Sequence, residues 1–396
     1  MNKSLVIGLL ALMTFVAGCQ KKVNEVPLKR PSAESNASIT ASLSVSTLRS
    51  DGTMLVNGQP FFPVGYYAEG YNTLTQNNYA ANTISAAGFN TIFTEHDAMS
   101  NSNFSAFLNN CAAKGIYNIL SFWDPSTAID AKMNSFIPMF KNKPSVLVWC
   151  IGDDASTLGS ESDILRKHNL ARSLDASHLT YESFNDQVRT RVIRTVSQSA
   201  GQSYVKFLPG DLMDGYGAWP AFVDIVTRCK AAGKTPYANL QTFKWDSGSN
   251  FLYPSAAECD VQSYMSIVAG MKGILYYTFK DYTISSTINI SQPALWDASV
   301  KVASEINSTL KDVLLNGVRT TTANTTDHVY YGKWVYNNAT YIIAVNVDQT
   351  PHAVSIPVTG STRTNLFAGR PATLTLNSNT LSGTLGALQT QIYKIN

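Results

Sequence analysis

The feature that most constrains this fold is an alternation, repeated eight times, of short β-rich segments with segments of helical period. Two of the helical segments, 103–115 and 221–234, run into a glycine at their ends, as helices often do. Eight such repeats over about 260 residues predict parallel strands joined by helices and closed into a TIM barrel. The eight predicted strands are 61–67, 91–94, 116–123, 145–152, 179–183, 204–209, 236–243 and 273–279.

A doubly wound nucleotide-binding sheet is the competing architecture. It usually carries a glycine-rich phosphate turn after its first strand. Here that turn reads YYAEGYN, so we expect no dinucleotide and no other cofactor. Before the first strand, Asn57 and Gly58 separate two apolar runs, which is a strong hairpin signal.

The pattern changes after the barrel to period-two alternation with short polar turns, which predicts an antiparallel β-sandwich. We therefore expect α/β architecture, a (β/α)8 TIM barrel followed by a small β-sandwich. The predicted divisions are a signal peptide and lipobox at 1–19, a flexible tether at 20–46, the barrel at 47–312 and the sandwich at 313–396.

The N-terminus has Lys3, an apolar run and two small residues before Cys19, which is the layout of a secretory signal peptide. It resembles the lipobox of bacterial lipoproteins, which implies lipidation of Cys19 and attachment to a membrane through that lipid. Gln20 follows the cysteine, and by resemblance to sorting in Gram-negative bacteria this implies the outer membrane of the cell envelope. The sequence leaves open which face of the membrane carries the protein.

Composition excludes one class of partner. Charged residues make up 14% of the chain and the formal net charge is +3, with Lys and Arg scattered. Nucleic-acid binding rests on clustered cations, so we expect no nucleic-acid partner. The four cysteines after Cys19 lack the paired spacing of a zinc site, although Cys229 and Cys259 are candidates for a disulfide.

Acidic and aromatic residues follow the predicted strands one after another. In a TIM barrel the C-terminal strand ends form the one open face, so these side chains are expected to share a pocket. The residues expected there to bind substrate are Tyr66, Glu69, Glu95, Trp123, Asp124, Asp153, Gln241, Trp245, Tyr277 and Asp281.

Such a ring of carboxylates and aromatic rings is what sugar chemistry needs. Hydrolysis of a glycoside uses one carboxylic acid to protonate the leaving oxygen and a second carboxylate as nucleophile or base. A metal site built from the acids with His96 is the alternative, but no paired histidines occur, so no metal is expected.

Two stretches, NGQPFFPVGYY and KPSVLVWCIGDD, resemble the first and fourth strands of the clan A glycoside hydrolases. The resemblance covers about residues 56–281 and implies a TIM barrel that acts on oligo- or polysaccharides. It implies that Asp153 takes the place of the asparagine that binds the sugar 2-hydroxyl. It also implies that Asp154 takes the place of the glutamate that is general acid and base.

The sequence departs from this family at both catalytic positions. Asp154 is one methylene shorter than glutamate, and a misplacement of about 1 Å can cost about 100-fold in rate. The nucleophile at the end of the seventh strand falls on Gln241, and an amide cannot act as a carboxylate nucleophile. The candidates for a second catalytic carboxylate are Asp211, Glu182 and Asp246, whereas Glu258 has the spacing of a helix capping box with Ser255.

Three functions remain open from the sequence. The first is a glycoside hydrolase with Asp154 as proton donor. The second is a carbohydrate-binding lipoprotein that has lost hydrolysis, and the third is a structural envelope protein without a ligand.

Overall fold

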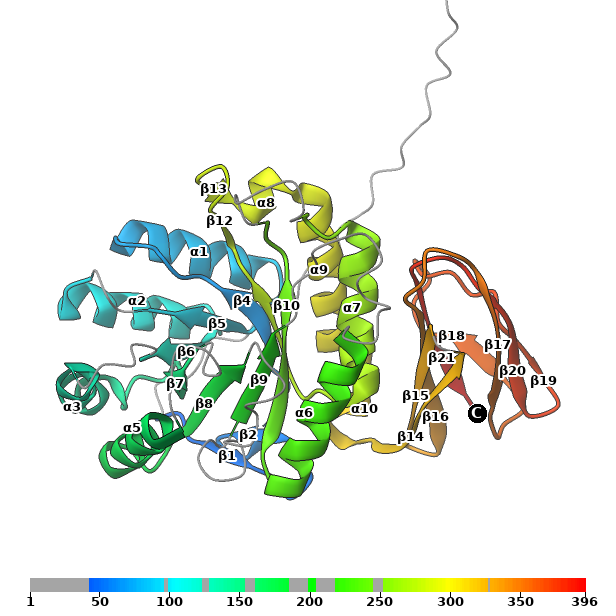
Figure 1. Ribbon diagram of the computed structural model, residues 1–396, viewed down its shortest axis with the longest axis horizontal. Helices are drawn as coiled ribbons and strands as arrows, with labels where there is room; N and C mark the ends of the chain where they lie inside the picture. The colour runs from blue at the N-terminus through cyan, green and yellow to red at the C-terminus, as the bar shows by residue number, and fades with distance from the viewer. Residues whose placement is uncertain are drawn as a thin grey trace, which may run out of the picture. The chain divides into compact units, whose positions relative to one another are not determined.

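The computed structural model describes residues 43–95, 99–122, 128–153, 161–184, 199–203, 218–244, 252–326 and 328–396. Within these residues, parallel strands close into a barrel in the order β10-β11-β4-β5-β6-β7-β8-β9 (Figure 1). This arrangement confirms the predicted TIM barrel. The barrel strands are β4 (Val64–Tyr67), β5 (Thr91–Thr94), β6 (Tyr117–Ser121), β7 (Val146–Gly152), β8 (Leu179–Phe184), β9 (Ser199–Ser203), β10 (Thr235–Gln241) and β11 (Ile274–Tyr277).

The sixth strand, β9, comes earlier than predicted. Its residues read SAGQS and carry no large apolar side chain, so a search for apolar β-rich runs passes over them. Its backbone pairs in parallel with both β8 and β10, and these ladders define the strand. The whole segment predicted at 204–209 lies outside the described residues.

Helices follow the strands, as the repeat predicts, and Figure 1 shows them outside the barrel. They are α1 (Leu74–Ala86), α2 (Asn101–Ala113), α3 (Ala128–Phe140), α5 (Glu161–Leu174), α6 (Ala218–Ala232), α7 (Ala256–Ala269), α8 (Ile288–Ser291), α9 (Pro293–Glu305), the π-helix η2 (Ile306–Leu310) and α10 (Lys311–Asn316). The predicted capping box is confirmed, because Ser255 accepts from the backbone of Glu258 and Glu258 accepts from the backbone of Ser255.

Alternate side chains of the barrel strands other than β9 pack into two separate cores. Those that point into the barrel include Tyr67, Phe93 and Tyr181, and those that point outward pack with the helices. Gly65 lets β4 approach β5 closely, since a Cβ at this position would lie 1.8 Å from the carbonyl oxygen of Thr91. Full burial of a large apolar side chain contributes about 1.5–3 kcal/mol, so these cores position the strand ends firmly.

A small antiparallel sheet closes the N-terminal end of the barrel. It consists of β1 (Ser46–Leu48), β2 (Met54–Val56) and β3 (Gln59–Phe61). The predicted hairpin turn joins β2 to β3, and both of its residues, Asn57 (φ 51°) and Gly58 (φ 77°), have positive φ. Met54 and Val56 belong to the interior core, so this sheet covers the bottom of the barrel.

The C-terminal region forms two antiparallel sheets, which confirms the predicted β-sandwich. One sheet has the order β14-β15-β16-β21-β18 and the other the order β17-β20-β19. Its strands are β14 (Val318–Thr326), β15 (Val329–Tyr336), β16 (Ala339–Asn346), β17 (His352–Pro357), β18 (Arg363–Asn365), β19 (Thr375–Asn377), β20 (Thr380–Leu385) and β21 (Gln389–Ile395). A short hairpin, β12 (Lys280–Asp281) with β13 (Ser286–Thr287), precedes α8.

Two further predictions concern the cysteines and the membrane. Cys111, Cys150, Cys229 and Cys259 are buried and free, so the disulfide considered between Cys229 and Cys259 is not formed. Among the described residues, every helix is too short or too polar to cross a membrane. The predicted signal peptide and Cys19 lie outside the described residues.

Candidate functional site

The C-terminal ends of the barrel strands meet at one rim, here called the mouth. Asp153 directly follows β7 and lies at this rim. Its Oδ1 accepts a hydrogen bond from the hydroxyl of Ser183 in β8, and the hydroxyl of Tyr67 in β4 lies 3.5 Å from the same oxygen. Side chains of the first and fifth barrel strands therefore converge on the carboxylate that follows the fourth.

Below Asp153, tyrosines form a polar floor inside the barrel. The hydroxyls of Tyr67 and Tyr181 are 3.4 Å apart, and Tyr181 donates to Oδ1 of Asn239 at 3.0 Å. Burial raises the pKa of both tyrosines well above the ordinary value, and the charge of Asp153 raises it further. Both hydroxyls stay protonated, and both are enclosed beneath Asp153, since Tyr67 is 2% exposed and Tyr181 0%.

A second group of acids lies beside the first. Burial raises the pKa of Tyr277, at the end of the eighth strand, and the next cause is the carboxylate of Glu69, to which Tyr277 is hydrogen-bonded. Asp153 adds a smaller effect of the same sign. Tyr277 therefore lies within electrostatic reach of two carboxylates that follow different strands.

Tyr282 extends this group toward solvent. Its side chain is 48% exposed, and its pKa is raised by partial burial and then by the charges of Glu69 and Glu95. The ammonium of Lys280 lies 4.8 Å from the centre of its ring. The residues that the mouth brings together are here called the mouth cluster: Glu69, Glu95, Asp153, Tyr277 and Tyr282.

Gln241 ends the seventh strand, where the resemblance places a nucleophile, and its amide is held in place. Its Nε2 donates to the carbonyl oxygens of Phe243 at 2.7 Å and Leu252 at 2.9 Å. The side chain is 1% exposed. The two carbonyl oxygens need a donor opposite them, so this position suits the NH2 group of an amide and disfavours a carboxylate.

Three predicted site residues lie away from the open mouth or are engaged within the fold. Glu182 is flanked in β8 by Tyr181 and Ser183, which point inward, so it faces outward. There burial raises the pKa of Cys229 in α6, the charge of Glu182 raises it further, and the same charge opposes the lowering of the Lys234 pKa by burial. The expectation that Glu182 faces the barrel centre is therefore wrong.

Tyr66 also points outward, fully buried, and its hydroxyl lies 2.8 Å from Ser299 in α9. It belongs to the core, so it cannot contact a ligand in the mouth as predicted. Asp281 is 3% exposed, and both of its oxygens accept from the hydroxyl of Tyr253 at 2.8 Å. Asp281 thus fixes the loop after the eighth strand.

The remaining predicted residues lie outside the described part of the chain: Trp123, Asp124, Asp154, Asp211, Trp245, Asp246 and the alternative metal ligand His96. Their proposed roles stay predictions.

Sequence reasoning missed Tyr67, Tyr181, Ser183, Asn239 and Tyr282. The strand period of two held the missing signal, because Tyr181 and Ser183 are the neighbours of Glu182 that share the opposite face. Glu182 was predicted because it is the acid of that strand, but it lies on the face that points away from the barrel interior.

A second polar cluster lies at the closed end of the barrel. The Nε2 atom of His178 lies 3.0 Å from the hydroxyl oxygen of Ser44, and its Nδ1 atom lies 2.6 Å from Oδ2 of Asp175. The indole of Trp149 donates to the same Oδ2 at 2.7 Å. This order of groups matches a Ser-His-Asp triad.

The closed-end cluster is structural, because its members are enclosed. Ser44 is 1% exposed, His178 0% and Asp175 4%, and the hydroxyl of Ser44 donates to the carbonyl oxygen of Val146 at 2.5 Å. No ligand can approach such a hydroxyl without opening the fold. Among the residues that the structure describes, no group of three or more His, Cys, Asp or Glu side chains has a metal-binding arrangement.

No family model matches this chain, and no curated protein matches its sequence. Solved structures match its fold. A glycoside hydrolase family 5 protein from Bacteroides vulgatus is 14% identical with a TM-score of 0.66, over 92% of this chain and 95% of that one. A family 30 endoxylanase from Clostridium papyrosolvens is 12% identical with a TM-score of 0.54, over 89% and 98%.

AmyP in complex with maltose is 11% identical with a TM-score of 0.59, over 84% of this chain and 92% of that one. The structural neighbours of this chain are thus glycoside hydrolases, and the likeness establishes a glycoside hydrolase-like fold.

Proposed function

We propose that this protein is a glycoside hydrolase that acts on an oligo- or polysaccharide at the mouth. One observation carries the proposal: Tyr277 lies within reach of two carboxylates, Glu69 and Asp153, at the open end of the barrel. Two acidic groups close enough to act on one glycosidic bond are what its hydrolysis requires. The fold of the glycoside hydrolases in the comparison supports the same reading.

In this proposal one acid protonates the glycosidic oxygen as its bond to the anomeric carbon breaks. A carboxylate then takes a proton from the water whose oxygen bonds to that carbon. Asp154 is the proposed proton donor, on the resemblance of the fourth strand. Glu69 is the proposed base, because a hydrogen bond from Tyr277 favours its charged form.

Asp153 and the exposed ring of Tyr282 hold the sugar in this proposal. The carboxylate of Asp153 accepts from hydroxyls of the sugar, and the buried hydroxyls of Tyr67 and Ser183 fix that carboxylate from below. Tyr282 offers a ring of which 48% is exposed, which suits contact with a sugar face.

A second candidate is carbohydrate binding without hydrolysis, and Gln241 favours it. Its amide occupies the seventh-strand position and is fixed by two carbonyl oxygens. Under this reading the mouth binds the glycan and releases no product.

The test is release of reducing sugar from a panel of plant and microbial polysaccharides by the purified chain, with Asp154→Ala and Glu69→Gln beside it. The matched control is Asp312→Asn, which changes an exposed acid in α10. Release that falls in both mouth variants and persists in the control supports hydrolysis. Thermal stabilisation by one glycan without release supports the binding candidate, and neither effect from any glycan contradicts both.

We also propose that the chain is lipidated at Cys19 and held at the bacterial envelope, in the outer membrane, on the pattern of its first 19 residues. Membrane fractionation of cells that express the parent and Cys19→Ala tests this. Equal distribution of the two between membrane and soluble fractions would refute it.

A further inference from the structure

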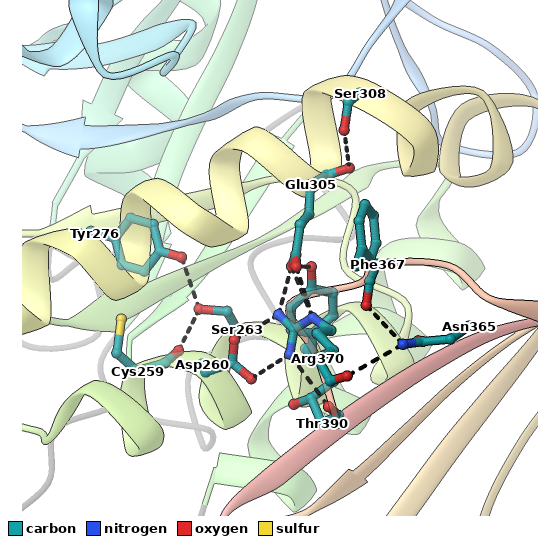
Figure 2. Close-up of polar contacts among 11 residues, drawn as sticks. Cys259, Asp260, Ser263, Tyr276, Glu305, Ser308, Asn365, Phe367, Arg370 and Thr390 are labelled. Carbon is teal, nitrogen blue, oxygen red and sulfur yellow. Dashed lines mark hydrogen bonds and ion pairs between the residues drawn. The ribbon is translucent and has the colours of Figure 1, made fainter. Parts of the chain in front are cut away.

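A buried arginine joins the sandwich to the barrel. Arg370, in the loop between β18 and β19, is 5% exposed. Its Nε donates to both oxygens of Glu305 at 2.9 and 3.0 Å, and its Nη1 and Nη2 donate to Asp260 at 3.0 and 2.7 Å (Figure 2). Paired carboxylates of this kind fix a guanidinium in both position and orientation.

The charge of Arg370 is retained despite burial. Burial alone would lower its pKa, but the neighbouring Tyr264, Asp260 and Glu305 raise it. The guanidinium also lies 4.5 Å from the ring centre of Tyr264, whose hydroxyl donates to Glu305 at 2.5 Å. Removal of the cation would leave the buried Glu305 and the half-buried Asp260 without their partner.

Two of these partners, Asp260 and Tyr264, belong to α7, and the sandwich holds this helix at a second point. Arg319, in β14, donates to the carbonyl oxygens of Val268 and Ala269 at the C-terminal end of α7, at 2.8 and 2.9 Å. Cys259 and the nine residues from Val261 to Ala269 are all buried. A helix buried around its whole circumference depends on both neighbours for its position.

The same helix supports the mouth. Gln262, two residues after Asp260, donates to the backbone carbonyl of Gln241 at 3.0 Å, at the end of the seventh barrel strand. Ser263 shares a hydrogen bond of 2.8 Å with the hydroxyl of Tyr276, which precedes Tyr277 in the eighth strand. The backbone of Thr242 donates to the carbonyl of Tyr277 at 2.6 Å, which links the two strand ends.

We propose that Arg370 is a positioning residue for the mouth: it fixes α7 through Asp260, and α7 fixes the ends of the seventh and eighth strands through Gln262 and Ser263. The sandwich is then part of the site although it contributes no group to the sugar. This inference rests on the proposed function only where it concerns sugar, because the order of the strand ends can be measured without a ligand.

The experiment compares Arg370→Met with Arg363→Met in the full chain. Arg363 is the matched control, because it lies in the same sandwich and its contacts, with the carbonyl oxygens of Ala372 and Leu374 and with the ring of Tyr393, are to other sandwich residues. Hydrogen exchange is followed at the amides of residues 240–243 and 274–279, well below the melting temperature. We expect exchange at these amides to rise about tenfold in Arg370→Met and to stay at the parental rate in Arg363→Met.

Sugar kinetics give the second readout. On a glycan that the parent hydrolyses or binds, Arg370→Met is expected to raise KM or Kd about tenfold, with a smaller change in kcat, because the pocket must be ordered when sugar binds. Parental exchange at the strand ends in a folded Arg370→Met protein would overturn the proposal. Increased exchange in a chain that acts on no glycan would uphold the positioning and refute only the proposed function.

A third variant covers the outcome in which Arg370→Met does not fold. Arg370→Met combined with Asp260→Asn and Glu305→Gln leaves no buried charge unpaired, so it is expected to fold. It still lacks the bidentate contacts, so fast exchange at the strand ends is expected to persist. Parental exchange in this triple variant would overturn the proposal.

Discussion

The two ends of the barrel carry similar side chains in opposite settings. At the closed end, Asp175 accepts from His178 and Trp149 beneath a covering sheet and is 4% exposed. At the mouth, Asp153 and Glu69 meet tyrosine hydroxyls at a rim where Tyr282 is 48% exposed. The closed end has the better triad geometry, and only the mouth has access.

This difference shows that the position of a polar cluster in a barrel says more about its role than its internal distances do. Ser44, His178 and Asp175 form hydrogen bonds with one another and with the backbone. These hydrogen bonds stabilise the packing of the first described segment against β7. Chemistry at strand ends needs groups that a substrate can reach. Four changes test this difference between the two ends.

Asp175→Asn should have the largest effect on stability and the least effect on the mouth. The carboxylate accepts from Trp149, His178 and the backbone of Ser177, and an amide nitrogen would face donors. We expect a loss of about 3 kcal/mol in the free energy of unfolding, measured in urea, with sugar affinity unchanged. A weaker sugar complex in this variant would contradict the separation of the two ends.

Gln241→Glu restores the acid of the resembling family, but it should not create activity. The carboxylate would face the carbonyl oxygens of Phe243 and Leu252, which now accept from the amide. We expect a loss of about 2 kcal/mol in unfolding free energy and no gain in sugar release. A rise in hydrolysis would instead identify this position as a dormant nucleophile site.

Acid should weaken the closed end through Asp175. Burial alone would raise the pKa of Asp175, but hydrogen bonds from His178, Trp149 and Ser177 lower it to about 2, from 3.8. Because the folded value is the lower one, this stabilisation is present above about pH 4 and is lost as pH falls from about 4 to 2. It amounts to about 2 kcal/mol.

Urea denaturation at several pH values between 2 and 5 measures this loss, with Asp175→Asn as the control. The variant has no carboxyl at this position, so its stability should fall less steeply over the same range. If the unfolding free energy of both proteins falls equally with pH, a group other than Asp175 causes the acid sensitivity.

Tyr282→Ala should have the smallest effect. The ring is 48% exposed and lies at the edge of the mouth, so its loss is expected to weaken sugar binding by about 1 kcal/mol, or about fivefold. Unfolding free energy should stay within about 0.5 kcal/mol of the parent. Titration calorimetry measures the first and urea the second, and unchanged affinity would remove Tyr282 from the site.

Local signals in the sequence predicted much of the fold. Asn57 and Gly58 predict their hairpin because both tolerate positive φ, and the spacing of Ser255 and Glu258 predicts the capping box. The barrel follows from the repeat itself. β9 escaped prediction because parallel pairing to its neighbours defines it, and pairing leaves no mark on the composition of SAGQS.

The site was predicted only in part, because it depends on which way each side chain points. Asp153 directly follows its strand, Glu69 is the second residue after its own, and both reach the mouth, whereas a one-residue difference in strand phase turns Glu182 toward α6. The contacts of Arg370 with Asp260 span 110 positions of sequence, and those of Ser44 with His178 span 134. Such distant pairs cannot be read from local pattern.

The burial of α7 also has a consequence for synthesis. A ribosome adds about 5–20 residues per second, so the 110 positions between Asp260 and Arg370 take roughly 5 to 20 s. During that interval the side of α7 that packs against the sandwich, which includes Tyr264, is not yet covered by the sandwich. The packing of the barrel is therefore complete only after a later part of the chain has been synthesised. A chaperone can bind the exposed helix during those seconds.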